Sequence, residues 1–176
     1  MDEAHAFGVF GNGLVSEFNL QKKVSATVVT YGKAMGTHGA AILTNDLIKS
    51  YLINFASPFI YTTSAHDFLW MSIFSGYEFL KANSRLSVQL QKNIKIFREQ
   101  NLVTPSSEKS PIQAIIIPDN HQLKTLQNVL SESGFLTYAV FNPTVKEGTE
   151  RLRICLHSFN TEDEILKLTG IIKEFV

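Results

Sequence analysis

The first third of the chain combines short apolar runs with stretches punctuated by glycine. Residues 26–30 and 39–43 are β-branched or apolar runs and are predicted as strands. Residues 2–20 show no period and contain several glycines, so we expect a loop that wraps over a site. The two strands therefore flank a turn in the thirties.

Helical periodicity follows the second predicted strand. Thr44 or Asn45 can cap a helix, and the apolar residues after them recur at helical spacing to about residue 55. Pro58 is expected to end this helix.

Residues 65–82 form the most apolar segment of the chain. Apolar side chains occur nearly all round the helix that this segment predicts, so we expect it to be buried in the chain or on assembly. Residues 84–100 predict a more polar helix whose apolar face is made by Leu86, Leu90, Ile94 and Phe97.

A break at Pro105 separates this helix from a stretch in which element types alternate. The pattern predicts strands at 112–117, 136–140 and 152–156, and helices at 120–133 and from a capping box at 161–164 onward. Strands alternating with helices indicate an α/β architecture. We expect two domains, residues 1–104 and residues 105–176.

The composition of the chain argues against several classes of function. The formal net charge of the 176 residues is zero, so the overall charge does not point to binding of nucleic acid or an anionic membrane. No segment has the length of a membrane span, and the N-terminus lacks a signal pattern. Cys155 is the single cysteine, so no internal disulfide can form and a cytoplasmic protein is the default expectation.

Candidate chemistry begins at Lys33, which lies between Gly32 and Gly36 directly after the first predicted strand. A lysine that forms an imine must lose its proton near neutral pH, which burial or nearby positive charge favours. The glycines allow a tight turn and close approach of a ligand. Thr30 could donate a hydrogen bond to a phosphate, although a surface lysine in a glycine turn gives the same local pattern.

The second candidate is the run Asp2-Glu3-Ala4-His5. These letters also spell the Mg-binding motif of helicase-type ATPases. That hypothesis requires a Gly-x-x-x-x-Gly-Lys-Ser/Thr phosphate loop, which residues 1–176 lack, and a basic surface, which a net charge of zero does not suggest. A plain acidic loop is the remaining alternative from the residues alone.

Taken together and in order, the motifs resemble the α-oxoamine synthase family, pyridoxal-phosphate enzymes of the aspartate-aminotransferase fold (fold type I). The resemblance covers essentially the whole chain and corresponds to the C-terminal half of such an enzyme: the end of the large domain plus the small C-terminal α/β domain. The motifs that carry it lie at residues 2–5, 30–36, 59–64, 110–117, 142–149 and 151–153.

The resemblance implies a pyridoxal 5'-phosphate cofactor and assigns residues to it. Lys33 would bind the cofactor as an imine and, once released, would remove the Cα proton of the substrate. Asp2 would hold the pyridine nitrogen protonated, and His5 would lie beside the ring and assist proton transfer. Thr30 would contact the phosphate. His5 and Lys33 are thus the expected catalytic residues, and no metal is expected, because the histidines lack metal-ligand spacing.

The resemblance also implies a homodimer with shared active sites. Thr62, with Thr63 and Ser64 as close competitors, would reach the phosphate of the neighbouring subunit's cofactor. Arg153 would bind the substrate carboxylate through two parallel hydrogen bonds, whereas Arg151 is expected to be structural.

The implied reaction condenses L-alanine with pimeloyl-CoA or a pimeloyl carrier protein, with decarboxylation, in biotin biosynthesis. A glycine-using relative such as 2-amino-3-ketobutyrate CoA ligase is the alternative. Since Asp2 should follow a strand and only Met1 precedes it, we expect a fragment of a longer enzyme.

Overall fold

The computed structural model describes residues 1–176 and divides into two compact units, residues 1–87 and residues 88–176. The first unit contains α1 (Leu14–Glu17), β1 (Ala26–Thr30), β2 (Ala40–Thr44), α2 (Asp46–Phe55), α3 (Ser57–Ile60) and α4 (Asp67–Ala82). The rest of the chain contains α5 (Arg85–Arg98), β3 (Ile112–Ile116), α6 (Asn120–Glu132), β4 (Tyr138–Val140), β5 (Arg151–Cys155) and α7 (Glu162–Lys173). The division falls within α5, and the boundary expected after residue 104 stays a prediction.

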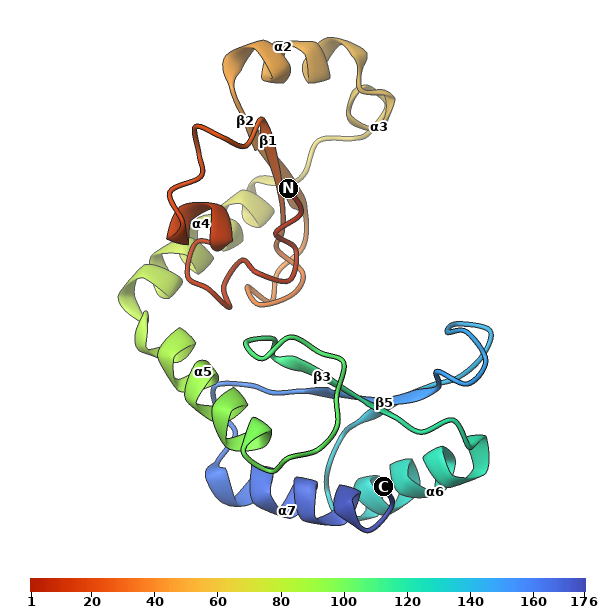
Figure 1. The fold of residues 1–176 in the computed structure, drawn as a ribbon. Coiled ribbons are helices and arrows are strands. Elements are labelled where there is room, and N and C mark those ends of the chain that lie inside the picture. The colour runs from red at the N-terminus through yellow and green to blue at the C-terminus, as the bar shows by residue number, and fades with distance from the viewer. The chain divides into compact units, whose positions relative to one another are not determined.

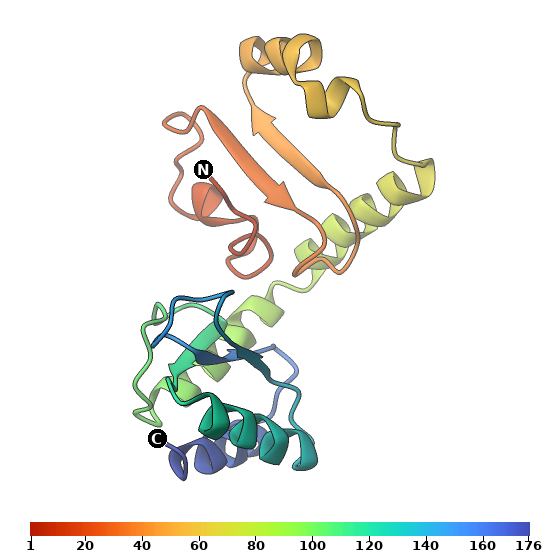
Figure 2. The same ribbon diagram turned by 90° about the vertical axis from the view of Figure 1, so that its right-hand side faces the viewer.

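The first unit is built on a β-hairpin. β1 and β2 pair antiparallel from Ala26 with Thr44 to Thr30 with Ala40, which confirms both predicted strands (Figure 2). Thr27 and Val29 are buried and Val28 is exposed, as expected for a strand with one covered face.

The helix after β2 begins as expected, and its end differs. The Asn45 side chain accepts a hydrogen bond from the backbone N–H of Ile48 (2.9 Å) and caps α2. The helix ends at Phe55, and Pro58 lies in the first turn of the next helix, α3, so its predicted role as the terminator of α2 is wrong. Proline is tolerated there because first-turn N–H groups have no partner within the helix.

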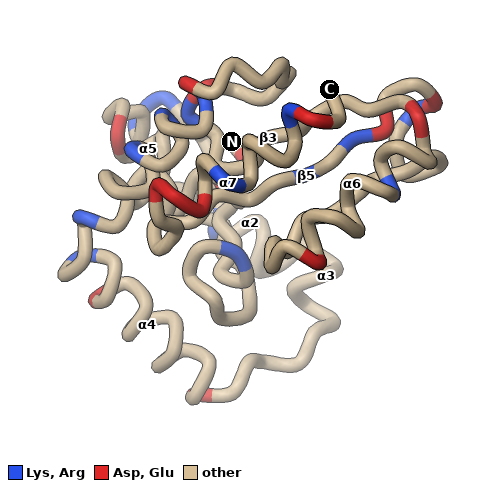
Figure 3. Tube along the Cα trace, turned by 90° about the horizontal axis from the view of Figure 1, so that it is seen from below, with Lys and Arg blue, Asp and Glu red and all other residues tan.

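α4 occupies the predicted apolar segment, but the chain does not bury it. Ile73 is its one buried residue. Large apolar side chains on its other faces are exposed: Phe68, Trp70, Met71, Phe74 and Phe79. Charged positions along it are few, so most of its trace is tan in Figure 3. Burial within the chain is therefore a wrong prediction, and burial on assembly stays a prediction. None of the helices combines the length and apolar character needed to cross a membrane.

The core of the first unit lies between the hairpin, the N-terminal loop and α4. Phe7, Val29, Tyr31 and Ile73 are buried together. The rings of Phe7 and Tyr31 meet edge to face at 6.1 Å, and Tyr77 of α4 lies 5.4 Å from Phe7. Edge-to-face aromatic pairs stabilise beyond their buried area, so this cluster fixes the end of β1 against α4.

The second unit is a three-stranded antiparallel sheet of order β3-β5-β4, with α6 and α7 side by side on one face (Figure 1). β5 is central, and Leu152 and Ile154 face the core. The helices contribute Leu123, Leu126, Leu130, Ile165, Leu168 and Ile172 to that core. Full burial of each such side chain contributes about 2 kcal/mol relative to exposure.

The caps of the second unit match the sequence signals. Thr161 and Glu164 form the predicted capping box at the start of α7. α6 starts after Asp119, whose Oδ1 accepts the N–H of Gln122 at 2.9 Å. Gly134 follows α6 at a φ of 89°, a conformation that favours glycine. The expected α/β composition is thus confirmed, with antiparallel pairing in each sheet.

Candidate active site

Lys33 lies in the turn that joins β1 to β2. The turn is closed by backbone hydrogen bonds from Tyr31 N to Gly39 O and from Thr37 N to Tyr31 O, both 2.9 Å. Gly36 and Gly39 have φ values of 67° and 102°, so the turn uses the backbone freedom of glycine. Lys33 is exposed, and its ammonium donates to Thr30 Oγ1 at 3.4 Å. The structure therefore brings Lys33 and Thr30 together.

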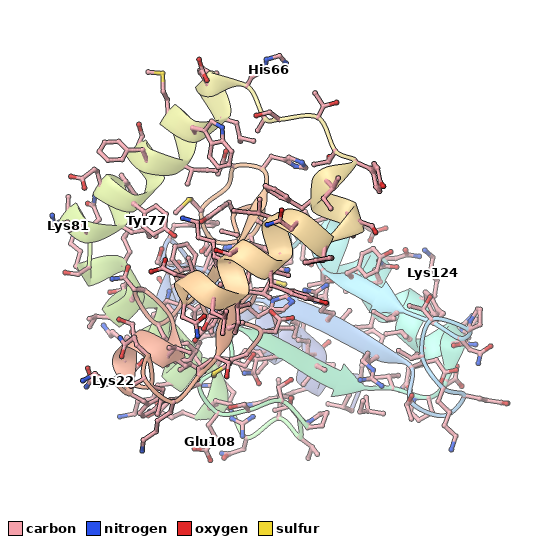
Figure 4. The ribbon with its side chains drawn as sticks, turned by 90° about the horizontal axis from the view of Figure 1, so that it is seen from above. Lys22, His66, Tyr77, Lys81, Glu108 and Lys124 are labelled. Carbon is pink, nitrogen blue, oxygen red and sulfur yellow. The ribbon has the colours of Figure 1, made fainter.

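Helix α4 holds this turn from one side. The Tyr31 and Tyr77 hydroxyls lie 3.2 Å apart, and Thr37 Oγ1 lies 3.0 Å from Ser72 Oγ. In Figure 4, Tyr77 lies on the side of α4 that faces the rest of the unit, and Lys81 lies on the outer side. Burial, followed by the hydrogen bond with Tyr31, raises the pKa of Tyr77. Its phenol therefore stays protonated at neutral pH and can keep this link.

Asp2 lies beside β1 on a short parallel bridge. Val28 N donates to Met1 O and Glu3 N donates to Val28 O, both at 2.8 Å. The Asp2 side chain is exposed, and its Oδ1 accepts the N–H of Ala4 at 2.7 Å. Asp2 is thus paired with Val28 in the middle of β1, two residues before Thr30.

His5 lies in the turn that follows Asp2. This turn is closed by Ala6 N and Phe7 N, which both donate to Glu3 O at 2.9 and 2.8 Å. His5 is exposed, while Glu3 is 1% exposed. The motif at residues 2–5 by itself gives Glu3 no role. Asp2 and Glu3 are neighbours, and successive side chains of an extended segment point to opposite sides. The sequence therefore could have indicated that one of the two carboxylates faces outward and the other inward.

Thr62 follows α3 and is exposed. α2 and α3 lie beyond the end of the hairpin that is opposite to the turn between β1 and β2 (Figure 2). Within one chain, the structure therefore does not bring Thr62 to Lys33. Thr63 and Ser64 share this exposed segment, and Ser64 Oγ donates to Ala65 O at 3.4 Å.

Arg153 belongs to the second unit. It lies on β5 opposite Tyr138 of β4, is exposed, and lines a hollow of about 650 Å³ together with Cys155. Cys155 is a free, exposed thiol. Arg151 is half-buried, and its Nε donates to Thr149 O at 2.8 Å. Arg153 thus presents its guanidinium outward, whereas Arg151 is tied to its own loop.

The structure contains no cluster of side chains suited to bind a metal ion. No group of three or more His, Cys, Asp or Glu side chains is placed to hold a metal ion. The first unit instead carries an amine in contact with a hydroxyl, Lys33 and Thr30, and a carboxylate, Asp2, on the segment paired with the middle of β1. Such groups can bind an aldehyde, an anion and a protonated ring nitrogen, respectively.

Comparison with known proteins places these residues in a family. The sequence profile described as aminotransferase class I and II matches residues 1–172. The chain belongs to the aminotransferase class I and II family. This assignment leaves the ATPase hypothesis for Asp2 to His5 without support.

Curated relatives narrow the resemblance within this family. The chain is 36% identical to an 8-amino-7-oxononanoate synthase of Emericella nidulans, over 94% of this chain and 43% of the relative. It is 35% identical to an 8-amino-7-oxononanoate synthase of Pseudomonas fluorescens, over 99% and 46%. The chain therefore spans about half the length of the curated relatives that it matches.

Solved structures agree with the class I and II aminotransferase fold. The crystal structure of 8-amino-7-oxononanoate synthase from Francisella tularensis matches with a TM-score of 0.86 and 31% identity, over 98% of this chain and 53% of that one. A serine palmitoyltransferase of Sphingomonas wittichii matches with a TM-score of 0.86 and 23% identity, over 98% and 45%. The second likeness supports the fold alone.

Proposed function

We propose that this chain supplies the C-terminal half of a pyridoxal-phosphate-dependent acyltransferase. The observation that carries the proposal is the setting of Lys33, an exposed lysine on a glycine turn whose ammonium donates to Thr30. Asp2 is paired with Val28, two residues before Thr30 on the strand that leads to this turn. An imine-forming lysine needs an accessible amine, and its cofactor needs a carboxylate at the ring nitrogen and donors at the phosphate.

The residues present fit this cofactor. Lys33 would bind its aldehyde carbon, the Asp2 carboxylate its ring nitrogen, His5 the side of the ring and Thr30 its phosphate. Thr62 would serve the phosphate of a second copy, in keeping with its place beyond the far end of the hairpin. When bound, the cofactor supplies an electron sink for the carbanion formed at the substrate Cα.

The chain's own side chains would then orient the amino acid and move its proton. Arg153 would hold the carboxylate by two parallel N–H to oxygen bonds, which fixes the direction of the Cα–H bond as well as binding charge. The Lys33 amine would take the proton from Cα and later return it. Its exposed position on the turn gives the side chain the freedom to move between these tasks.

For substrates, we propose L-alanine and a pimeloyl thioester, with loss of carbon dioxide, to give 8-amino-7-oxononanoate for biotin synthesis. The names of the relatives at 31–36% identity support this choice. Either pimeloyl-CoA or a pimeloyl carrier protein can present the acyl group. Glycine is the alternative amino acid. We further propose a homodimer in the cytoplasm, where the lone thiol Cys155 stays reduced.

The test is an absorbance titration with pyridoxal phosphate, followed by borohydride reduction and peptide mapping. It is run on residues 1–176 and on the same residues joined behind the N-terminal half of the Emericella nidulans relative. We expect a yellow form in the joined protein, with the label on Lys33 and lost in Lys33→Ala. Lys22→Ala, an exposed lysine outside the turn, is the matched control. A label on another lysine, or a folded joined protein that stays colourless, refutes the proposal.

A further inference from the structure

The buried Glu3 carboxylate belongs to the segment that also carries two proposed cofactor residues, Asp2 and His5. It is 1% exposed, and burying a carboxylate is costly unless hydrogen bonds satisfy it. The burial of Glu3 is explained by the hydrogen bonds of its main chain and its carboxylate.

The main chain of Glu3 joins the strand to the histidine turn. Its N–H donates to Val28 O at 2.8 Å, which fixes the segment of Asp2 against β1. Its carbonyl oxygen accepts the N–H groups of Ala6 and Phe7, which closes the turn that contains His5. The positions of Asp2 and His5 are therefore both set at this residue.

The side chain of Glu3 connects this residue to the other end of the N-terminal loop, at Leu14 and Val15. Oε2 accepts the N–H of Leu14 at 2.8 Å, and Oε1 accepts the N–H of Val15 at 2.6 Å. Gly13, at a φ of 98°, packs directly on the carboxylate, and a Cβ at this residue would overlap it. Both ends of the loop from 4 to 15 thus converge on one buried group.

We propose that Glu3 is a positioning residue that fixes Asp2 and His5 relative to the Lys33 strand by closing this loop from inside. The inference rests on the proposed function for its link to the cofactor. A carboxylate is required because it accepts two N–H bonds at once. Glutamine replaces one acceptor with a donor and leaves one of the two amides without a partner.

The first test is hydrogen exchange on residues 1–176. In Glu3→Gln we expect the Leu14 or Val15 amide to exchange at least about tenfold faster, together with the turn amides of Ala6 and Phe7. Glu17→Gln, an exposed carboxylate of α1, is the matched control and should leave these rates unchanged. If Glu3→Gln does not fold, Glu3→Asp, which keeps the charge and shortens the side chain, is measured in its place. Unchanged rates at all four amides overturn the proposal.

The second test separates positioning from simple stabilisation. In the cofactor-loaded joined protein, we expect Glu3→Gln to shift the pH midpoint of the cofactor absorbance by about half a unit or more, because Asp2 and His5 move relative to the ring. A looser loop with an unchanged midpoint shows that Glu3 only stabilises the loop, and overturns the positioning role. A parent protein that never binds the cofactor refutes the proposed function instead, while exchange at Ala6 and Phe7 still decides whether Glu3 positions the histidine turn.

Discussion

Lys33 is placed by its backbone rather than by its side chain. The residues around it are fixed by two backbone hydrogen bonds and by the Tyr31 and Thr37 contacts with α4. Its own ammonium makes one long hydrogen bond, to Thr30, and is exposed. A turn fixed by backbone hydrogen bonds and an exposed ammonium suit the role that we propose for Lys33, in which its amine exchanges one bonding partner for another.

Arg153 gives a prediction at the same scale. Arg153→Lys keeps the positive charge and removes the planar fork, so we expect KM for the amino acid to rise about tenfold in the cofactor-loaded joined protein. Steady-state kinetics with varied amino acid measure this. Arg151→Lys is the control, since Arg151 bonds its own loop at Thr149 O. Equal KM changes in the two variants would contradict the assignment.

Two helical glycines give a matched prediction at the scale of elements. Gly170 in α7 has open space where a Cβ would stand, so Gly170→Ala should stabilise the second unit by about 1 kcal/mol through helix propensity. In α4, a Cβ on Gly76 would lie 2.7 Å from Met35 Cγ in the lysine turn. Gly76→Ala should therefore lose this gain, because Met35 must shift. Urea unfolding measures both, and equal stabilisation by the two changes contradicts the close packing of α4 on the turn.

The start of α6 gives a pH prediction. The Gln122 N–H bond holds the pKa of Asp119 below its ordinary value of 3.8. A lowered pKa in the folded state means that the charged cap stabilises the fold above the unfolded pKa, and that this is lost as the pH falls through the folded pKa. Asp119→Asn, which keeps an acceptor without the charge, should thus unfold at lower urea than the parent near neutral pH. The two should converge once the pH falls below the lowered pKa of Asp119.

Urea midpoints across this range measure the effect. Glu108→Gln, an exposed change in a loop, serves as the control for general charge effects. A difference between parent and Asp119→Asn that stays constant down to acid pH would contradict the cap assignment.

Local signals predicted the elements well, and long-range contacts account for the failures. β1, the Asn45 cap and the Thr161 capping box follow from residues within a few positions of one another, as does the Lys33 to Thr30 contact. The exposure of α4 was not predictable, because its apolar pattern specifies a surface to be covered and does not say whether this chain covers it.

The site shows the same limit. The motif letters indicated Asp2 and His5, yet the role of Glu3 depends on partners 11 and 12 residues away. The Tyr31 and Tyr77 contact spans 46 residues and has no local signal in the sequence.

At the scale of the whole molecule, the feature that most affects behaviour in solution is the number of exposed apolar side chains. Along α4, Phe68 and Phe74 are 81% and 68% exposed, and exposed aromatic residues also occur on α2 and α3. Several exposed large apolar side chains on one helix are typical of a face that another chain covers. Residues 1–176 alone should therefore bind the dye ANS and associate with themselves.

Phe68→Lys combined with Phe74→Lys should lower ANS fluorescence at least about twofold and reduce association, with the helix signal unchanged. Val103→Lys, which removes an isolated exposed side chain outside α4, should change neither. Fluorescence and sedimentation velocity measure the two effects. Equal ANS binding by the parent and the double variant would show that the apolar surface that binds the dye lies outside α4.

The thiol of β5 makes the second unit easy to observe. Cys155 is the single cysteine of the chain, it is exposed, and it lines the same hollow as Arg153 two residues along the strand. A thiol-reactive fluorophore will therefore attach at one known place without any engineering. Its emission should change when a carboxylate binds at Arg153, the role that we propose for this residue, so the chain carries its own attachment point for a binding sensor.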